Sequence, residues 1–170
     1  VLVKLGHHWH GHKVLDGGQK IKLQPGIIGA QANRLLASYG RKIGPDPASI
    51  DTAMIGGIIA NNASGMCCGT SKNSYKTVDS IRLILIDGTL LDTSDEKSIE
   101  HFRKEKSELL KSIAATRQEI LADKQLSQLI HKKYRIKNTT GYGLNSFVDF
   151  EDPIDILVHL MIGSEGTLAF

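Results

Sequence analysis

Short stretches of alternating polar and apolar residues predict two β-hairpins. The first pairs residues 12–16 with residues 20–24 across a Gly-Gly turn, and the second pairs residues 81–86 with residues 89–92 across an Asp-Gly turn. Both turns contain the residue types that tight two-residue connections require. Two further short strands are expected at residues 1–5 and 167–170.

Apolar residues at helical spacing predict three helices outside the centre of the chain. The first follows a Pro-Gly turn, over residues 28–39, with Gly40 as its C-terminal cap. A short buried helix is expected at residues 55–60, within a stretch rich in turns and glycine. A last apolar helix is expected at residues 154–162, after a proline.

Residues 94–137 are rich in Lys, Glu, Gln, Leu and Ala, which are good helix formers. An apolar stripe predicts helices here, with Asp123 as a break between two of them. Such a stretch is either a partner-binding or membrane-surface helix, or a solvated face that covers the core. Because its charges are of mixed sign, we expect the solvated face. The stripe consists of Leu109, Leu110, Ile113, Arg117, Ile120, Leu121, Leu126, Leu129 and Ile130.

The composition of the chain argues against several classes of protein. The 170 residues are 41% hydrophobic and 23% charged, which is typical of a globular domain and argues against a disordered chain. The net charge of +3 does not predict nucleic-acid binding. No apolar run reaches the roughly 18 residues of a transmembrane helix, and residues 1–5 are too short for a signal-peptide core. We expect a cytoplasmic protein, with peripheral association at the inner face of the membrane as the alternative.

The only two cysteines, Cys67 and Cys68, are adjacent in the sequence. They cannot build an ordinary disulfide framework, which favours a reducing compartment. Adjacent thiols close only a strained ring, so we expect small buried hydrophobes in preference to a redox pair. The chain has no initiating methionine and stops within an apolar run, and we expect it to be a fragment.

The glycine-rich segment at residues 55–65 is the strongest candidate for binding chemistry. It contains the Gly56-Gly57 pair and ends in Asn62, Ala63, Ser64 and Gly65. Glycine leaves room for main-chain N–H groups to converge on an anion such as a pyrophosphate. A tightly packed turn explains paired glycines equally well. The spacing matches neither the Walker pattern nor the Rossmann fingerprint.

Three other turns have similar chemistry. Residues 163–167, Gly-Ser-Glu-Gly-Thr, expose amides and a hydroxyl at a helix-to-strand junction, and residues 45–47, Pro-Asp-Pro, form a stiff wall. Residues 138–142 offer amide, hydroxyl and aromatic groups to a ring. Rigid turns of this kind, although separated in sequence, are expected to meet around one extended ligand.

Histidines are concentrated in residues 7–12. His8, His10 and His12 share one face of a regular strand, which is a pattern for metal ligands. No acidic or thiolate partner lies nearby and Gly11 implies a bend, so we expect a polar loop or strand edge and no metal site. The order of residues does not assemble a catalytic triad, a zinc spacing or paired carboxylates, and no catalytic residue is assigned.

Taken together, five motifs resemble the FAD-linked oxidases of the vanillyl-alcohol-oxidase type, which have a PCMH-type FAD-binding domain. A narrower similarity, through residues 44–50, 65–70 and 149–170, is to the large FAD and iron-sulfur D-2-hydroxyacid dehydrogenases. The five motifs are Gln24-Pro25-Gly26, Pro45-Asp46-Pro47, Ile55-Gly56-Gly57 with Asn61 to Gly65, Asp87-Gly88, and Ile162 to Leu168.

The resemblance implies an α+β fold, the larger subdomain of a PCMH-type FAD-binding domain, with a mixed or antiparallel sheet flanked by helices. Residues 1–170 then form a partial domain, and residues 94–137 are a helical insertion within it. In the family, an upstream phosphate loop and a C-terminal substrate domain with the catalytic base complete the site, and the resemblance implies that both lie outside this chain.

Motif by motif, the resemblance assigns thirteen residues to FAD. Residues 45–46 and 55–57 correspond to pyrophosphate and flavin contacts, residues 62–65 to the loop beside the flavin ring and ribityl chain, and residues 162–167 to a flanking turn. Because residues 64–69 contain no histidine for covalent attachment, non-covalent FAD is expected. The assigned residues are Pro45, Asp46, Ile55, Gly56, Gly57, Asn62, Ala63, Ser64, Gly65, Ile162, Gly163, Gly166 and Thr167.

The resemblance also implies an activity for the parent protein. It would oxidise a D-2-hydroxyacid of the D-lactate, D-2-hydroxyglutarate or glycolate type to the 2-oxoacid by hydride transfer to FAD. Electrons would pass on to an iron-sulfur cluster in the parent or to a quinone, and the fragment alone would be inactive. The alternatives are a non-catalytic nucleotide- or anion-binding module and a helical interaction module.

Overall fold

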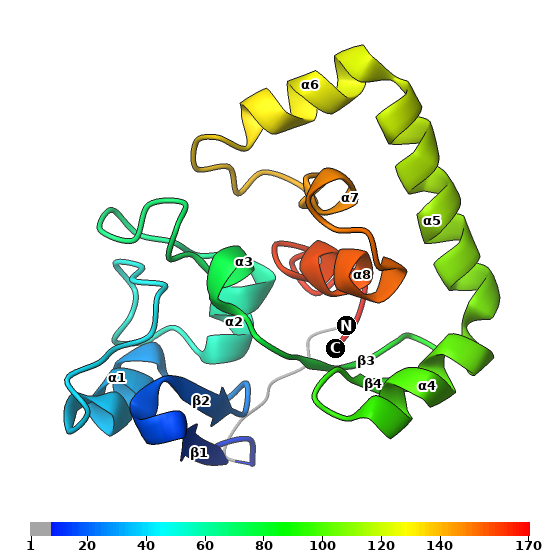
Figure 1. Ribbon diagram of the computed structural model, residues 1–170. Coiled ribbons are helices and arrows are strands. Elements are labelled where there is room, and N and C mark those ends of the chain that lie inside the picture. Colours follow the sequence, from blue (N-terminus) through cyan, green and yellow to red (C-terminus); the bar gives the residue numbers. More distant parts are fainter. Residues whose placement is uncertain (1–7) are drawn as a thin grey trace. The chain divides into compact units, whose positions relative to one another are not determined.

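The computed structural model describes residues 8–170 and divides the chain into two compact units, Val1–Thr77 and Val78–Phe170 (Figure 1). The strand expected at residues 1–5 lies outside the described residues. Each unit combines helices with a two-stranded antiparallel sheet, so the α+β class expected from the sequence is confirmed. No parallel pairing of strands occurs within residues 8–170.

The first unit opens with the predicted hairpin. Strands β1 (His12–Leu15) and β2 (Lys20–Leu23) pair antiparallel, with His12 opposite Leu23. Their connection is a short 3-10 turn, η1 (Asp16–Gly18), in which all three residues have positive φ. After the hairpin the chain stays close to it, because Gly26 N–H donates to the carbonyl of Trp9 at 2.9 Å.

Helix α1 (Gly29–Ala37) confirms the first predicted helix and buries Ala32 and Leu36. It ends at Ala37 with Ser38 as its C-cap, earlier than the expected cap at Gly40. Gly40 still turns the chain away from the helix, with a φ of +65° and an N–H that donates to the carbonyl of Ala37. The short helix α2 (Ile55–Ala60) is also confirmed, although only Ile58 in it is fully buried. A four-residue helix that the pattern did not predict, α3 (Ser74–Thr77), closes the unit.

The second unit begins with the second predicted hairpin, β3 (Arg82–Ile84) and β4 (Leu90–Asp92), in which Arg82 lies opposite Asp92. The strand expected at residues 167–170 is reduced to a bridge beside β3. There, Ile84 and Phe170 exchange N–H to carbonyl hydrogen bonds of 2.7 and 2.9 Å.

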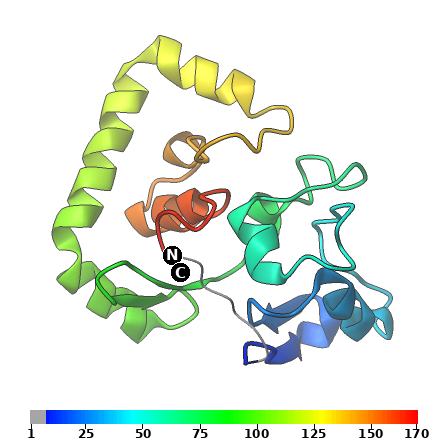
Figure 2. The same ribbon diagram turned by 180° about the vertical axis from the view of Figure 1, so that it is seen from behind.

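Three consecutive helices follow, α4 (Glu96–Glu105), α5 (Ser107–Ala122) and α6 (Lys124–Lys133). They run around the outside of this unit, with α4 and α6 at opposite ends of α5 (Figures 1 and 2). The predicted break at Asp123 is confirmed, because its carboxylate caps α6 by accepting from the N–H groups of Gln125 and Leu126. A second break, at Lys106, was not predicted.

Two further helices complete the unit. The four-residue helix α7 (Ser146–Asp149) was not predicted. Helix α8 (Pro153–Met161) begins at its proline, one residue before the expected start, and Asp152 caps it by accepting from Ile154 N–H. Helix α5 packs against both α7 and α8.

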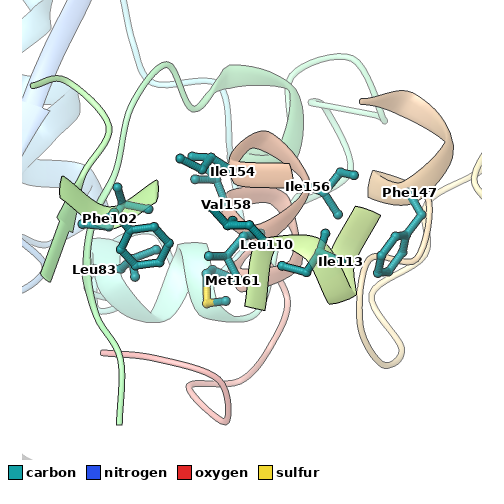
Figure 3. Close-up of a cluster of buried hydrophobic side chains, with 11 residues drawn as sticks. Leu83, Phe102, Leu110, Ile113, Phe147, Ile154, Ile156, Val158 and Met161 are labelled. Atoms are coloured by element: carbon teal, nitrogen blue, oxygen red, sulfur yellow. The ribbon is translucent and has the colours of Figure 1, made fainter. Parts of the chain in front are cut away.

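The core of this unit joins its hairpin with α4, α5, α7 and α8 (Figure 3). Phe102 of α4 and Ile156 of α8 have no exposed surface, and Leu110 and Ile113 of α5 pack with them. The 94–137 stretch therefore covers the core, as the sequence predicted. Among the described residues, no helix is both long enough and apolar enough to span a bilayer.

Candidate functional site

The residues assigned to FAD lie in two groups, one in each unit. Nine of them belong to the first unit, in residues 45–46, 55–57 and 62–65, and four belong to the second, in residues 162–167. That both groups face one ligand stays a prediction.

The loop at residues 62–65 is anchored at both ends. Ala63 N–H donates to the carbonyl of Ile58, so the loop continues directly from α2. Asn62 has a φ of +48°, and its side-chain oxygen accepts from Tyr75 N–H at 3.2 Å. Asn is among the few residues that adopt this left-handed conformation readily, which explains the asparagine at this position.

The predicted wall at residues 45–47 contacts this loop. Asp46 N–H donates to the carbonyl of Ser64 at 3.2 Å. A Cβ added to Gly65 would lie 1.7 Å from the Asp46 carbonyl oxygen, and Gly65 has a φ of +85°. Only glycine permits both the conformation and the close approach. The structure thus brings together two motifs that lie well apart in the sequence.

Two side-chain contacts that the sequence did not predict support the same loop. Lys42 Nζ lies 2.9 Å from Asp46 Oδ2, and this hydrogen bond and charge raise the pKa of Lys42. The i, i+4 spacing of Lys42 and Asp46 was the available signal, although they do not lie on a helix. The Cys68 thiol, 3% exposed, lies 2.8 Å from the Ser64 carbonyl oxygen. The expectation of a small buried residue is therefore confirmed for Cys68 and wrong for Cys67, which is exposed.

The Gly56-Gly57 pair serves two different purposes. The N–H groups of Ile55 and Gly56 already donate to the carbonyls of Ile27 and Pro25, at 2.7 and 2.9 Å. A Cβ on Gly56 would also lie 2.8 Å from Pro25 Cβ. Tight packing therefore explains Gly56, and its amide is not available to an anion.

Tight packing does not explain the glycine at position 57. It is exposed, its φ is not positive, and a Cβ there would meet no atom within 4 Å. Glycine inside a helix costs about 1 kcal/mol relative to alanine, so its presence next to open space calls for another cause. Within residues 8–170, the N–H groups of Gly57, Ser64 and Gly65 have no hydrogen-bond partner. A backbone without side chains, together with N–H groups that have no partner, is suited to bind the phosphates of a cofactor.

The second group forms the turn that follows α8. Positive φ values occur at Gly163, Glu165 and Gly166, and Thr167 N–H closes the turn on the carbonyl of Ser164. Thr167 Oγ1 lies 2.9 Å from the hydroxyl of Tyr142. The element expected at residues 138–142 therefore contacts this turn, and that the two line one ligand site stays a prediction.

The histidine-rich segment holds no metal cluster among the residues that the structure describes, and none of its neighbours adds one. His7 lies outside that range. The described histidines 8 and 10 are exposed.

Comparison with known proteins connects the first unit with flavin binding. The family described as FAD binding domain matches residues 1–94, which include the whole first unit and the β3–β4 hairpin of the second. The chain belongs to this FAD-binding family. The family match covers the loop at residues 62–65 and Gly57, and it ends before the turn at residues 163–167. No solved structure matches the chain.

The chain is similar to three curated proteins, all named D-2-hydroxyglutarate dehydrogenase. The proteins of Haemophilus influenzae and Pantoea ananatis are each 26% identical to it, over 175 and 182 aligned residues, and match all of the chain. The Escherichia coli protein is 28% identical over 154 residues and matches 88% of the chain. The chain spans only 15% to 17% of the length of these relatives.

Proposed function

We propose that this chain is the FAD-binding segment of a flavin-dependent D-2-hydroxyacid dehydrogenase that binds FAD without a covalent link. FAD, when bound, supplies the acceptor for the hydride removed from the hydroxyacid. The names of the three relatives favour D-2-hydroxyglutarate over the D-lactate or glycolate type as the substrate. An iron-sulfur cluster of the parent or a quinone would take the electrons onward, and a cytoplasmic protein with peripheral membrane association suits either acceptor.

The role of this chain's own residues in that proposal is to hold and orient the cofactor. The free N–H groups of Gly57, which is exposed, and Gly65, which is half-buried, would donate to its phosphate or flavin oxygens, whereas Ser64 is only 2% exposed. Asp46, whose side chain is paired with Lys42, would hold the loop through the hydrogen bond from its backbone N–H to the carbonyl of Ser64. It is not proposed to transfer a proton in the reaction. Residues 162–167 would flank the same ligand. No residue here is proposed as the catalytic base.

The observation that carries the proposal is Gly57, because nothing inside its own unit requires a glycine there. If a ligand fills the space above it, a side chain at this position should block binding without disturbing the fold. Gly57→Leu in the intact protein should lower FAD affinity at least tenfold, which is about 1.4 kcal/mol. Titration calorimetry with FAD and urea unfolding of the apoprotein measure the two effects separately.

A matched control is Ala37→Leu, which adds a similar side chain at an exposed position of α1 in the same unit. It should leave FAD affinity unchanged. Unchanged FAD affinity in Gly57→Leu would refute the proposed contact between the cofactor and the backbone at residue 57. An intact protein that is fully folded but colourless would favour a nucleotide- or anion-binding module. Oxidation of a panel of D-2-hydroxyacids by the intact protein then tests the substrate. The isolated chain should bind FAD weakly and be inactive.

A further inference from the structure

Residues 124–148 differ in charge from the rest of the chain. They contain five cations, Lys124, Lys132, Lys133, Arg135 and Lys137, and no acidic residue. The whole chain has a net charge of +3, so the remaining residues together are net negative. The mixed charges of the longer 94–137 stretch conceal this concentration.

The five cations are exposed and unpaired. All lie on α6 or on the connection that follows it, and none forms an ion pair within the described part of the chain. Cations near a helix C-terminus are favoured by the helix dipole, which accounts for Lys132 and Lys133. Arg135 and Lys137 lie beyond the end of α6, where the dipole gives no such reason.

Large apolar side chains lie exposed between these cations. Ile136 is 72% exposed and Leu129 is 60% exposed. The segment that carries Ile136 is fixed in place, because the hydroxyl of Tyr134 donates to the carbonyl of Tyr142 at 2.8 Å and accepts from Leu144 N–H. Exposed apolar and basic side chains therefore alternate along one short part of the chain, and the backbone at its C-terminal end is held in place.

We propose that residues 124–144 form a surface that binds anionic lipid bilayers. Clusters of four to eight Lys or Arg residues suit the negative surface of such a membrane, and exposed apolar side chains gain by entering the headgroup region. A nucleic acid would satisfy the cations but not Ile136 and Leu129. This inference rests on the peripheral membrane association of the proposed function and adds the surface that would make the contact, and this surface does not involve the residues assigned to FAD.

Cosedimentation of the intact protein with phosphatidylcholine vesicles, with and without phosphatidylglycerol, tests this surface. The protein should bind only the vesicles that contain phosphatidylglycerol, and less at high salt. The double variant Lys132→Gln with Lys133→Gln should lower the partition coefficient roughly 25-fold, since each cation near the surface contributes about fivefold. Ile136→Ser should lower it about tenfold.

The control pair is Lys97→Gln with Lys104→Gln, two exposed lysines of α4, which lies at the other end of α5 (Figure 2). It changes the net charge equally and should not change vesicle binding. Failure of the intact protein to bind, or an equal loss in the control pair, overturns the proposal. Binding that is insensitive to Ile136→Ser, together with equal binding to duplex DNA, would assign the surface to nucleic acid. FAD content, read from the visible spectrum of the same preparation, shows whether the proposed function fails independently.

Discussion

At the scale of single residues, the meeting of Gly65 with Asp46 is the tightest constraint of the candidate site. Gly65 combines positive φ with a carbonyl oxygen lying where its Cβ would be. A ligand loop held in this way is set by backbone contacts and does not depend on the rotamers of long side chains. That suits a site whose task is to place a cofactor.

Gly65→Ala should therefore destabilise the protein by more than its backbone conformation alone explains. Gly88 is the matched control, because it has nearly the same φ, +88°, but nothing within 4 Å of an added Cβ. Gly88→Ala should cost about 1 kcal/mol and Gly65→Ala clearly more, about 3 kcal/mol. Urea unfolding measures both, and equal losses would contradict the close approach.

Asp92 predicts a pH dependence of stability. Burial by itself raises the pKa of this carboxyl, but hydrogen bonds from Ser94 and Arg82 lower it from 3.8 to about 2. A lowered pKa in the folded state stabilises the fold above pH 3.8, and this stabilisation disappears as pH falls through 2. Asp92→Asn should cost about 2 kcal/mol at pH 7 and little at pH 2, measured by urea unfolding.

Asp87 provides the comparison for that measurement. Its hydrogen bond with Lys106 likewise lowers its pKa to about 2, but its side chain is half exposed. High salt should remove the effect of Asp87→Asn and preserve that of Asp92→Asn. Asp92 itself is only 6% exposed, so a loss of both effects in salt would contradict the burial of its carboxylate.

At the scale of elements, helix ends explain which sequence predictions succeeded. Asp123 ends one helix and caps the next, and the sequence showed it as a polar break in an apolar stripe. The break at Lys106 has no such signal, because no side chain there caps α5. The four-residue helices α3 and α7 are too short to show a period, so pattern analysis could not find them.

Asp123→Ala should lower stability by about 1 kcal/mol, because two N–H groups of α6 lose their acceptor. Hydrogen exchange should accelerate at Gln125 and Leu126 in particular. Asp123→Asn keeps an acceptor oxygen and is the control, with a change of only a few tenths of a kcal/mol. Equal effects of the two variants would show that charge, not capping, is at work.

At the scale of the whole molecule, the sequence predicted both hairpins and the longer helices but could not predict how separated turns meet. The contact of residues 45–47 with the loop at residues 62–65 is non-local and follows no period. The contacts of Cys68 with Ser64 and of Lys42 with Asp46 were not predicted for the same reason. The glycine pair also divides into one packing residue and one open position, which spacing alone does not distinguish.

The helical stretch at residues 94–137 cannot be a detachable insertion, because it supplies part of the second unit's core. Deleting it should abolish cooperative unfolding of that unit. Leu110→Ala is a milder test of the same point. It should lower the free energy of unfolding by roughly 2–5 kcal/mol, because Leu110 is only 7% exposed. The neighbouring Leu109 is 37% exposed, so Leu109→Ala should lower the free energy of unfolding by well under half as much. Comparable losses in a denaturant titration would argue against the packing of α5.

The only tryptophan of the chain, Trp9, lies in the first unit, where its carbonyl accepts from Gly26, whereas the longest helices lie in the second. The two halves therefore carry different optical labels. Indole emission follows the unfolding of the first unit, and far-ultraviolet circular dichroism follows mainly the second. Separate midpoints from these two signals would identify two cooperative blocks, and coincident midpoints would identify one.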